Sequence, residues 1–161
     1  MSETVEPLDG RLFGDGQPCF GCSPTHPHGF HLAYRREGDE VVTTFLPGAL
    51  HQGPVGIMHG GLVSTLADES AAWAVIAATG KFGFTTSFTA KLHQAVRIGV
   101  EVEARAKVTS ASSRIVKSTV VIRQAGRDCF TGDFVFVLLD KAGAEKLMGG
   151  PIPAAWERFC R

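Results

Sequence analysis

The sequence predicts an α+β domain in which an antiparallel sheet of five to six strands wraps around one long central helix. An apolar stretch without Gly or Pro, residues 62–79, predicts the helix, and apolar and polar residues alternate with a period of two on either side of it. Strands do not alternate with helices along the chain, which argues against a parallel βαβ sheet. The length of 161 residues suits a single domain.

Residues 1–27 predict an irregular N-terminal arm, of which residues 1–18 are expected to be unpacked unless a partner subunit orders them. Gly and Pro recur through residues 7–18, and the segment CFGCSPTHPHG that follows is dense in turn formers. Residues 29–48 then predict two strands joined as a hairpin, with the turn at Glu37-Gly38-Asp39.

The long helix is expected to end at Gly80, because glycine readily adopts the left-handed conformation of a helix C-cap. Its residues are apolar nearly all round the helix, as expected of one enclosed by other structure. The triplet His59-Gly60-Gly61 precedes its first turn.

A meander of four long strands is predicted after the helix. In the first of them, Phe84, Thr86, Phe88, Ala90 and Leu92 would share one face. The others are expected near residues 100–108, 115–123 and 129–139, separated by turn signals. Residues 28–140 would then be the folded domain, and residues 141–161 a tail with a short helix near 154–159.

Composition excludes several classes of protein. Lys and Arg total 16, as do Asp and Glu, so the net charge is zero, which argues against a nucleic-acid binder driven by counterion release. The hydrophobic fraction is an ordinary 44%, and no long apolar run indicates a membrane protein. Residues 81–127 hold nine bases and two acids, a bias that suits nucleic acid, an acidic partner, the phosphates of a large cofactor or simply solvated strands.

The four cysteines are too few and too scattered for a disulfide scaffold, so a reducing cytoplasm is the expected location. Cys19-x-x-Cys22, with His26 and His28 nearby, offers four zinc-ligand types. The spacing after Cys22 is too short for a usual zinc finger, and no thioredoxin-like pattern surrounds the pair. We therefore expect neither a metal nor a redox role for them.

A narrow polar stripe runs down the predicted helix. Asp68 lies seven residues after Gly61, which places the two within about 20° of each other around the helix axis. Backbone N–H groups at a helix start can stabilise an oxyanion, and a carboxylate two turns away can act as a base or nucleophile.

The same stripe also fits a purely structural interpretation. In that interpretation Asp68 is a buried polar group satisfied by local hydroxyls, and Gly60 and Gly61 only permit a tight turn. Glu69 is a second candidate acid, offset by about 100° around the helix.

The segment GIMHGGLVSTLADE, residues 56–69, resembles the signature of hotdog-fold acyl-CoA thioesterases of the phenylacetate-degradation (PaaI-like) type. The preceding His51-Gln52-Gly53 is similar to many relatives, although many of these carry Asn where this loop has Gln52 or Gly53. Length and element order agree over residues 28–140, and CFGCSPTHPHGFHL resembles a leader found in a subset of the superfamily.

The resemblance implies a catalytic site at the start of the helix. The backbone N–H of Gly60 or Gly61 would polarise the thioester carbonyl. Asp68 would be the nucleophile or the base that activates water.

Three further residues enter on the same resemblance. Gln52 or His59 would orient the carbonyl or the loop, and Thr85 would place a hydroxyl near the attacking water. The family also implies a homodimer or homotetramer with sites at the dimer interface, and the cationic residues 81–127 would then suit the phosphates of coenzyme A.

The function expected from this resemblance is hydrolysis of an acyl-CoA thioester to the free acid and coenzyme A, without metal or redox cofactor and without a nucleic-acid or membrane partner. A non-catalytic acyl-CoA-binding module and another acyl-thioester enzyme of the same fold, such as a dehydratase or hydratase, are the alternatives. Aryl, short-chain and medium-chain acyl groups all fit the sequence, which assigns none of Trp73, Phe82, Phe84 and Phe88 to acyl recognition.

Overall fold

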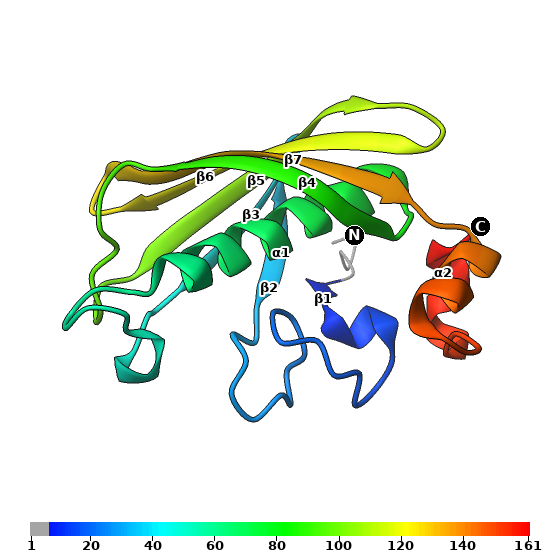
Figure 1. The fold of residues 1–161 in the computed structure, drawn as a ribbon, viewed down its shortest axis with the longest axis horizontal. Coiled ribbons are helices and arrows are strands. Elements are labelled where there is room, and N and C mark those ends of the chain that lie inside the picture. The colour runs from blue at the N-terminus through cyan, green and yellow to red at the C-terminus, as the bar shows by residue number, and fades with distance from the viewer. Residues whose placement is uncertain (1–6) are drawn as a thin grey trace, which may run out of the picture.

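A seven-stranded antiparallel sheet curves around the helix α1 in the computed structural model, which describes residues 7–161 (Figure 1). The strands are β1 (Leu8–Asp9), β2 (Ala33–Glu37), β3 (Glu40–Phe45), β4 (Gly83–Leu92), β5 (Val102–Ala111), β6 (Ile115–Gln124) and β7 (Arg127–Leu138). The helices are α1 (Gly60–Thr79) and α2 (Lys141–Met148), with 3-10 turns η1 (Gly10–Phe13), η2 (Ala49–His51) and η3 (Ala154–Phe159). The α+β class is confirmed, and with the two-residue β1 the sheet has seven strands where five to six were expected.

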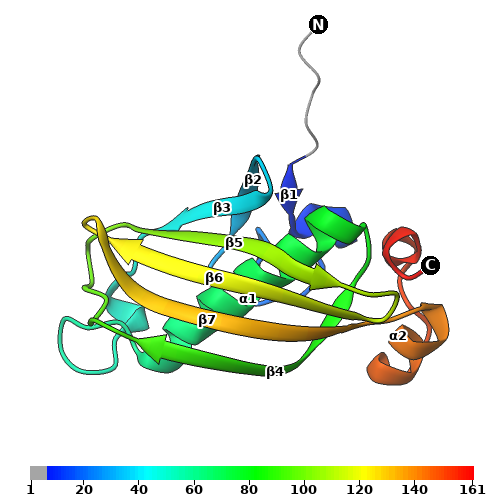
Figure 2. The same cartoon turned by 90° about the horizontal axis from the view of Figure 1, so that it is seen from above.

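The strand order β1-β2-β3-β5-β6-β7-β4 differs from the predicted meander at one point. The strand β4 pairs with β7 at the far edge of the sheet, whereas β5 pairs with β3 and β6. The chain therefore crosses from one side of the sheet to the other between β4 and β5, passing the start of α1 (Figure 2). Local alternation identifies strands but does not decide which edge each one joins.

The helix α1 begins at Gly60, two residues before the predicted start, and ends as expected at Gly80, whose φ is 67°. Both sides of the helix are covered, by the sheet on one and by the N-terminal arm on the other (Figure 1). Trp73 of α1 and Phe130, Phe134 and Phe136 of β7 are among the largest fully buried side chains. This double coverage explains why the helix is apolar nearly all round.

The arm is packed through residues such as Leu8 and Phe13, so the prediction of an unpacked segment is wrong for the described part of residues 1–18. Leu8 and Phe13 are buried. The centroid of the Phe13 ring lies 5.9 Å from that of Trp73 and 4.5 Å from that of Phe159. The arm contacts the helix mainly through turns, which leave no periodic pattern in the sequence. Residues 1–6 of the predicted arm lie outside the described residues, and the domain boundaries at 27 and 140 stay predictions.

A β-bulge in β4 changes which of its side chains face the helix. In the register of the two strands, Thr85 pairs with Phe136 and Phe88 pairs with Phe134, with the register shift at Thr86 between them. The side chains of Thr85 and Phe88 therefore lie on the same face of the sheet as the buried Phe134 and Phe136. Phe84 is left on the opposite face. The prediction that Phe84 shares a face with Phe88 is therefore wrong. A strict alternation of period two does not hold across a bulge, where one strand has an extra residue.

The C-terminal tail contains the predicted short helix as η3, and also the helix α2, which was not predicted. Within residues 7–161, no helix has the length and apolar character required to span a bilayer.

Candidate active site

The start of α1 is capped by the side chain of His59, which fixes the glycines that follow. Its Nδ1 accepts a hydrogen bond of 2.9 Å from the backbone N–H of Gly61. The backbone N–H of Gly60 has no acceptor among the described residues, and Leu92 at the end of β4 borders it, 3.3 Å from where a Cβ on Gly60 would stand. Of the two glycines, Gly60 therefore keeps a free donor.

Gln52 holds the loop that leads into the helix. Its Oε1 accepts from the backbone N–H of Gly56 at 2.7 Å, and its Nε2 donates to the carbonyl of Ala49 at 3.0 Å. His51, beside it, accepts from the backbone N–H of Gly48, and burial lowers the pKa of His51. Both ends of the Gln52 amide thus serve to shape the loop.

Asp68 and Thr85 meet between the helix and β4. The Thr85 hydroxyl donates a hydrogen bond of 2.7 Å to Asp68 Oδ1. Burial raises the pKa of Asp68, while this hydrogen bond opposes the rise. The second oxygen, Oδ2, has no hydrogen-bond partner within residues 7–161 and remains available to a ligand.

The local hydroxyls of α1 do not satisfy Asp68. Ser64 donates to the carbonyl of Gly60 and Thr65 to that of Gly61, so both hydroxyls bond back to their own helix. The partner of Asp68 comes instead from another element, through Thr85. A carboxylate and a hydroxyl are thereby held together between α1 and β4.

Glu69 lies on a different side of the helix, against the N-terminal arm. It accepts from Trp73 Nε1 at 3.1 Å, and the Cys19 thiol lies 3.6 Å from its Oε1. Burial raises the pKa of Glu69 to about 8. The structure brings Glu69 together with Cys19 and Cys22, a grouping that the sequence does not indicate because the cysteines precede Glu69 by about 50 residues.

The histidines of the arm do not join that group. His26 Nδ1 accepts from the backbone N–H of His28 at 3.1 Å, and the His26 ring packs edge-on against Phe20. The set of zinc ligands considered from the sequence, Cys19 and Cys22 with His26 and His28, is therefore not assembled.

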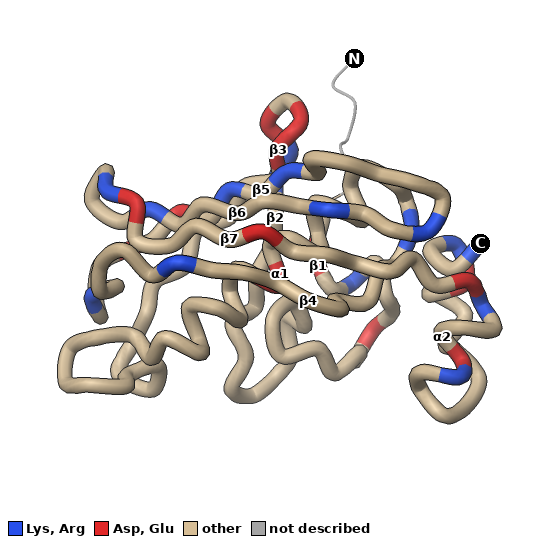
Figure 3. Tube along the Cα trace, turned by 45° about the horizontal axis from the view of Figure 1, so that its top comes forward, with Lys and Arg blue, Asp and Glu red and all other residues tan. Residues whose placement is uncertain are grey.

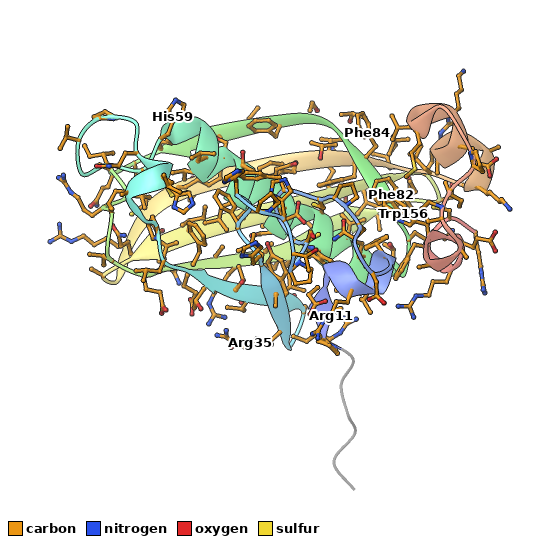
Figure 4. All side chains as sticks on the ribbon, turned by 90° about the horizontal axis from the view of Figure 1, so that it is seen from below. Arg11, Arg35, His59, Phe82, Phe84 and Trp156 are labelled. Carbon is orange, nitrogen blue, oxygen red and sulfur yellow. The ribbon has the colours of Figure 1, made fainter. Side chains whose placement is uncertain are left out.

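Trp73 and Phe82, two of the four candidate acyl-recognition aromatics, take part in core packing, whereas Phe88 is 48% exposed. Trp73 is fully buried, Phe88 stacks on Phe134, and the Phe82 ring meets Trp156 edge-on at 4.7 Å. Figure 4 shows Phe82 and Trp156 together, at the opposite end of the helix from His59. Phe84 is 46% exposed on β4.

The basic residues of 81–127 do not form one patch. Arg105 bonds to Glu37, Glu40 and Glu103, and Arg123 to Asp128, so these two are neutralised within the chain. The remaining bases are distributed along the sheet and at both of its ends (Figure 3). Lys81 and Arg114 line one cavity of about 390 Å³ beside α2.

Comparisons with known proteins agree with this architecture. Residues 55–130 match the family model described as the thioesterase superfamily. A crystal structure of a thioesterase superfamily protein is similar at 24% identity and a TM-score of 0.69, over 84% of this chain and 72% of that one.

Two bacterial structures are similar over a smaller part of the chain. A hypothetical thioesterase from Streptococcus pneumoniae, solved with coenzyme A, is 19% identical over 65% of this chain and 86% of its own, with a TM-score of 0.61. A putative thioesterase related to phenylacetic acid degradation from Ralstonia eutropha is 16% identical over 67% and 85%, with a TM-score of 0.61.

At these identities the solved structures establish the shared fold, a hotdog fold. Among curated proteins, none matches this sequence. The region that matches the family model contains α1 with its capped N-terminus, Asp68 and the β4 strand that carries Thr85. Residues 55–130 therefore match the thioesterase superfamily, and the chain shares the hotdog fold of the solved structures.

Proposed function

We propose that this protein is an acyl-CoA thioesterase of the PaaI-like type, which hydrolyses an acyl-CoA thioester to a free acid and coenzyme A. The observation that carries the proposal is the hydrogen bond from Thr85 of β4 to Asp68 of α1. The same helix α1 opens with the free backbone N–H of Gly60. A carboxylate and an oxyanion donor on one helix are the two groups that thioester hydrolysis needs.

The proposed reaction starts with the thioester carbonyl oxygen at the N–H of Gly60. Asp68 then acts through Oδ2, either removing a proton from the attacking water or attacking the carbonyl carbon itself. Negative charge develops on the carbonyl oxygen and is stabilised by the Gly60 donor and the positive end of α1. Collapse of the tetrahedral intermediate breaks the C–S bond, and the departing thiolate of coenzyme A takes up the proton that Asp68 removed from water, or one from solvent. Where Asp68 itself is the nucleophile, the acyl group stays on it as a mixed anhydride, which a water molecule then hydrolyses to release the free acid.

The other predicted residues have supporting roles in this proposal. His59 holds Gly61 so that the helix start keeps its shape, and Gln52 fixes the loop that approaches the carbonyl. Thr85 orients Asp68 so that its second oxygen points to the water. The proposed chemistry uses no metal or redox cofactor.

Coenzyme A as the leaving group is supported by the Streptococcus pneumoniae neighbour, whose structure contains it. The unpaired bases among residues 81–127 would supply charge for its phosphates. The free thiols of all four cysteines support a reducing cytoplasm as the location.

A homodimer or homotetramer with the site at its interface is part of the proposal. The strand β4 is an edge of the sheet and exposes three large apolar side chains, Phe84, Phe88 and Leu92, at 46%, 48% and 53%. An exposed apolar edge strand is a surface that proteins usually cover by pairing. The same strand carries Thr85, so pairing there would bring a second copy next to Asp68.

Release of free thiol from short, medium, long and aromatic acyl-CoA thioesters tests the proposed function. Multiple turnovers on one class would establish hydrolysis and outline the acyl pocket. Thermal stabilisation by the thioesters without thiol release would instead show a binding module that uses the same cleft. If the thioesters produced no turnover and no thermal stabilisation, the result would contradict acyl-CoA as the ligand.

A further inference from the structure

We propose that Cys19, Cys22 and Glu69 form a zinc site that fastens the N-terminal arm to helix α1. The two Sγ atoms and a Glu69 carboxylate oxygen all lie within 4.8 Å of one another. They come from two segments about 50 residues apart, so the fold rather than the local sequence brings them together. The site lies beyond the proposed hydrolysis and does not depend on it.

The spacing of the donor atoms suits a tetrahedral zinc ion. The Cys19 Sγ lies 3.6 Å from Oε1 and 3.7 Å from Oε2 of Glu69. Zinc bonds of about 2.3 Å to sulfur and about 2.0 Å to oxygen give a sulfur–oxygen edge of about 3.5 Å in a tetrahedron. Small side-chain rotations would therefore be enough to place an ion between these atoms.

Neighbouring groups orient the proposed ligands. Trp73 Nε1 donates to Oε1 of Glu69, which leaves Oε2 for an ion, and Gln17 Nε2 lies 3.8 Å from Cys22 Sγ. Gln17 Oε1 also accepts from the backbone N–H of Cys19, so one side chain contacts both ends of the pair. Such outer contacts commonly fix metal ligands in place.

Gly21 allows the arm to close over the carboxylate. A Cβ at this position would stand 2.5 Å from the Glu69 carboxyl carbon, closer than any real contact. The backbone between the two cysteines is thus pressed directly against the third donor. This close approach distinguishes the group from three side chains that merely share a surface.

The surroundings of Glu69 lack a positive charge. No Lys or Arg of residues 7–161 forms a salt bridge with it, and its hydrogen-bond donors are the Trp73 indole and the Cys19 thiol. Two thiolates and one carboxylate favour zinc over the hard cations calcium and magnesium, and binding would release the thiol protons to solvent.

The role that follows for the ion is structural. Three protein ligands leave one position, which a water molecule would fill from the partly exposed side of Cys19. Glu69 faces the arm while Asp68 faces β4, so the zinc would lie on a different side of the helix from the hydrolytic groups. It would join the loop of residues 19–22 to the centre of α1.

Metal analysis of the full chain, purified with reductant and dialysed, is the first test. We expect about one zinc per chain in the wild type and only traces in Glu69→Gln, Cys19→Ser and Cys22→Ser. Cys129→Ser is the matched control, since Cys129 is a buried thiol outside the group, and it should retain the zinc. Circular dichroism of each variant confirms that loss of zinc does not come from loss of the fold.

Cobalt gives a readout that is independent of the variants. Co²⁺ added to the metal-free, reduced wild type should produce thiolate-to-cobalt charge transfer and strong tetrahedral absorption at one equivalent, and Zn²⁺ should abolish both. Folded wild type that holds only traces of zinc and gives no such spectrum would overturn the proposal. A Cys19–Cys22 disulfide in place of bound metal, shown by a mass lower by two hydrogens, would also overturn it.

Discussion

Thr85 donates a hydrogen bond of 2.7 Å to Asp68, joining the edge strand β4 to the central helix at the candidate site. This contact depends on the bulge at Thr86, which turns Thr85 toward the helix. The bond occupies one carboxylate oxygen and leaves the other for water or substrate. The orientation of the acid is thus controlled by a strand rather than by the helix that carries it.

Replacing Thr85 by Val is expected to change the pH dependence of hydrolysis. The hydroxyl stabilises the ionised form of Asp68, so its removal raises the pKa of a carboxyl that burial has already raised. Because the reaction needs ionised Asp68, the acid limb of the kcat/KM profile should move to higher pH, by about one unit. Thr85→Ser keeps the donor and should restore the limb, and an unchanged profile in Thr85→Val would show that the bond has no catalytic role.

Removing the cap at the helix start should lower stability. In His59→Ala the N–H of Gly61 loses its acceptor, and we expect a loss of about 1 kcal/mol in the free energy of unfolding. His59→Asn supplies a good capping side chain and should recover most of that loss in denaturant titrations. If His59→Asn is stable yet inactive, His59 contacts the substrate, contrary to the capping role given to it here.

Charge placed on the β4 edge should prevent self-association. Phe84 and Leu147 are both 46% exposed, one on the edge strand and the other on α2. We expect light scattering to show that Phe84→Glu reduces the molecular mass to that of one chain and that Leu147→Glu does not. An oligomer that survives Phe84→Glu would place the interface elsewhere.

The helix and its polar stripe could be predicted from sequence because their signals are local. An apolar run closed by Gly80 defines the helix, and a separation of seven residues places Asp68 on the side of Gly61. The free donor proved to be Gly60, since His59 caps Gly61, and this depends on a side-chain conformation that spacing does not reveal.

Contacts between segments that are far apart in the sequence could not be predicted from local patterns. The pairing of β4 with β7 depends on how the chain crosses the sheet, and the bulge breaks the simple alternation. The arm packs through isolated residues such as Phe13, and Glu69 meets Cys19 across about 50 residues. Each of these contacts joins two distant segments, and local sequence patterns do not indicate which segments lie next to each other in the fold.

The most direct test of the central claim is thiol release by Asp68→Asn and wild type, measured side by side on the preferred acyl-CoA. The substitution keeps the size of the side chain and removes its ability to act as a base or nucleophile, so kcat should fall by about 10²–10⁴. Asp133→Asn, on the exposed face of β7, is the control and should keep full activity. A folded Asp68→Asn protein with wild-type kcat would contradict the assignment of the site.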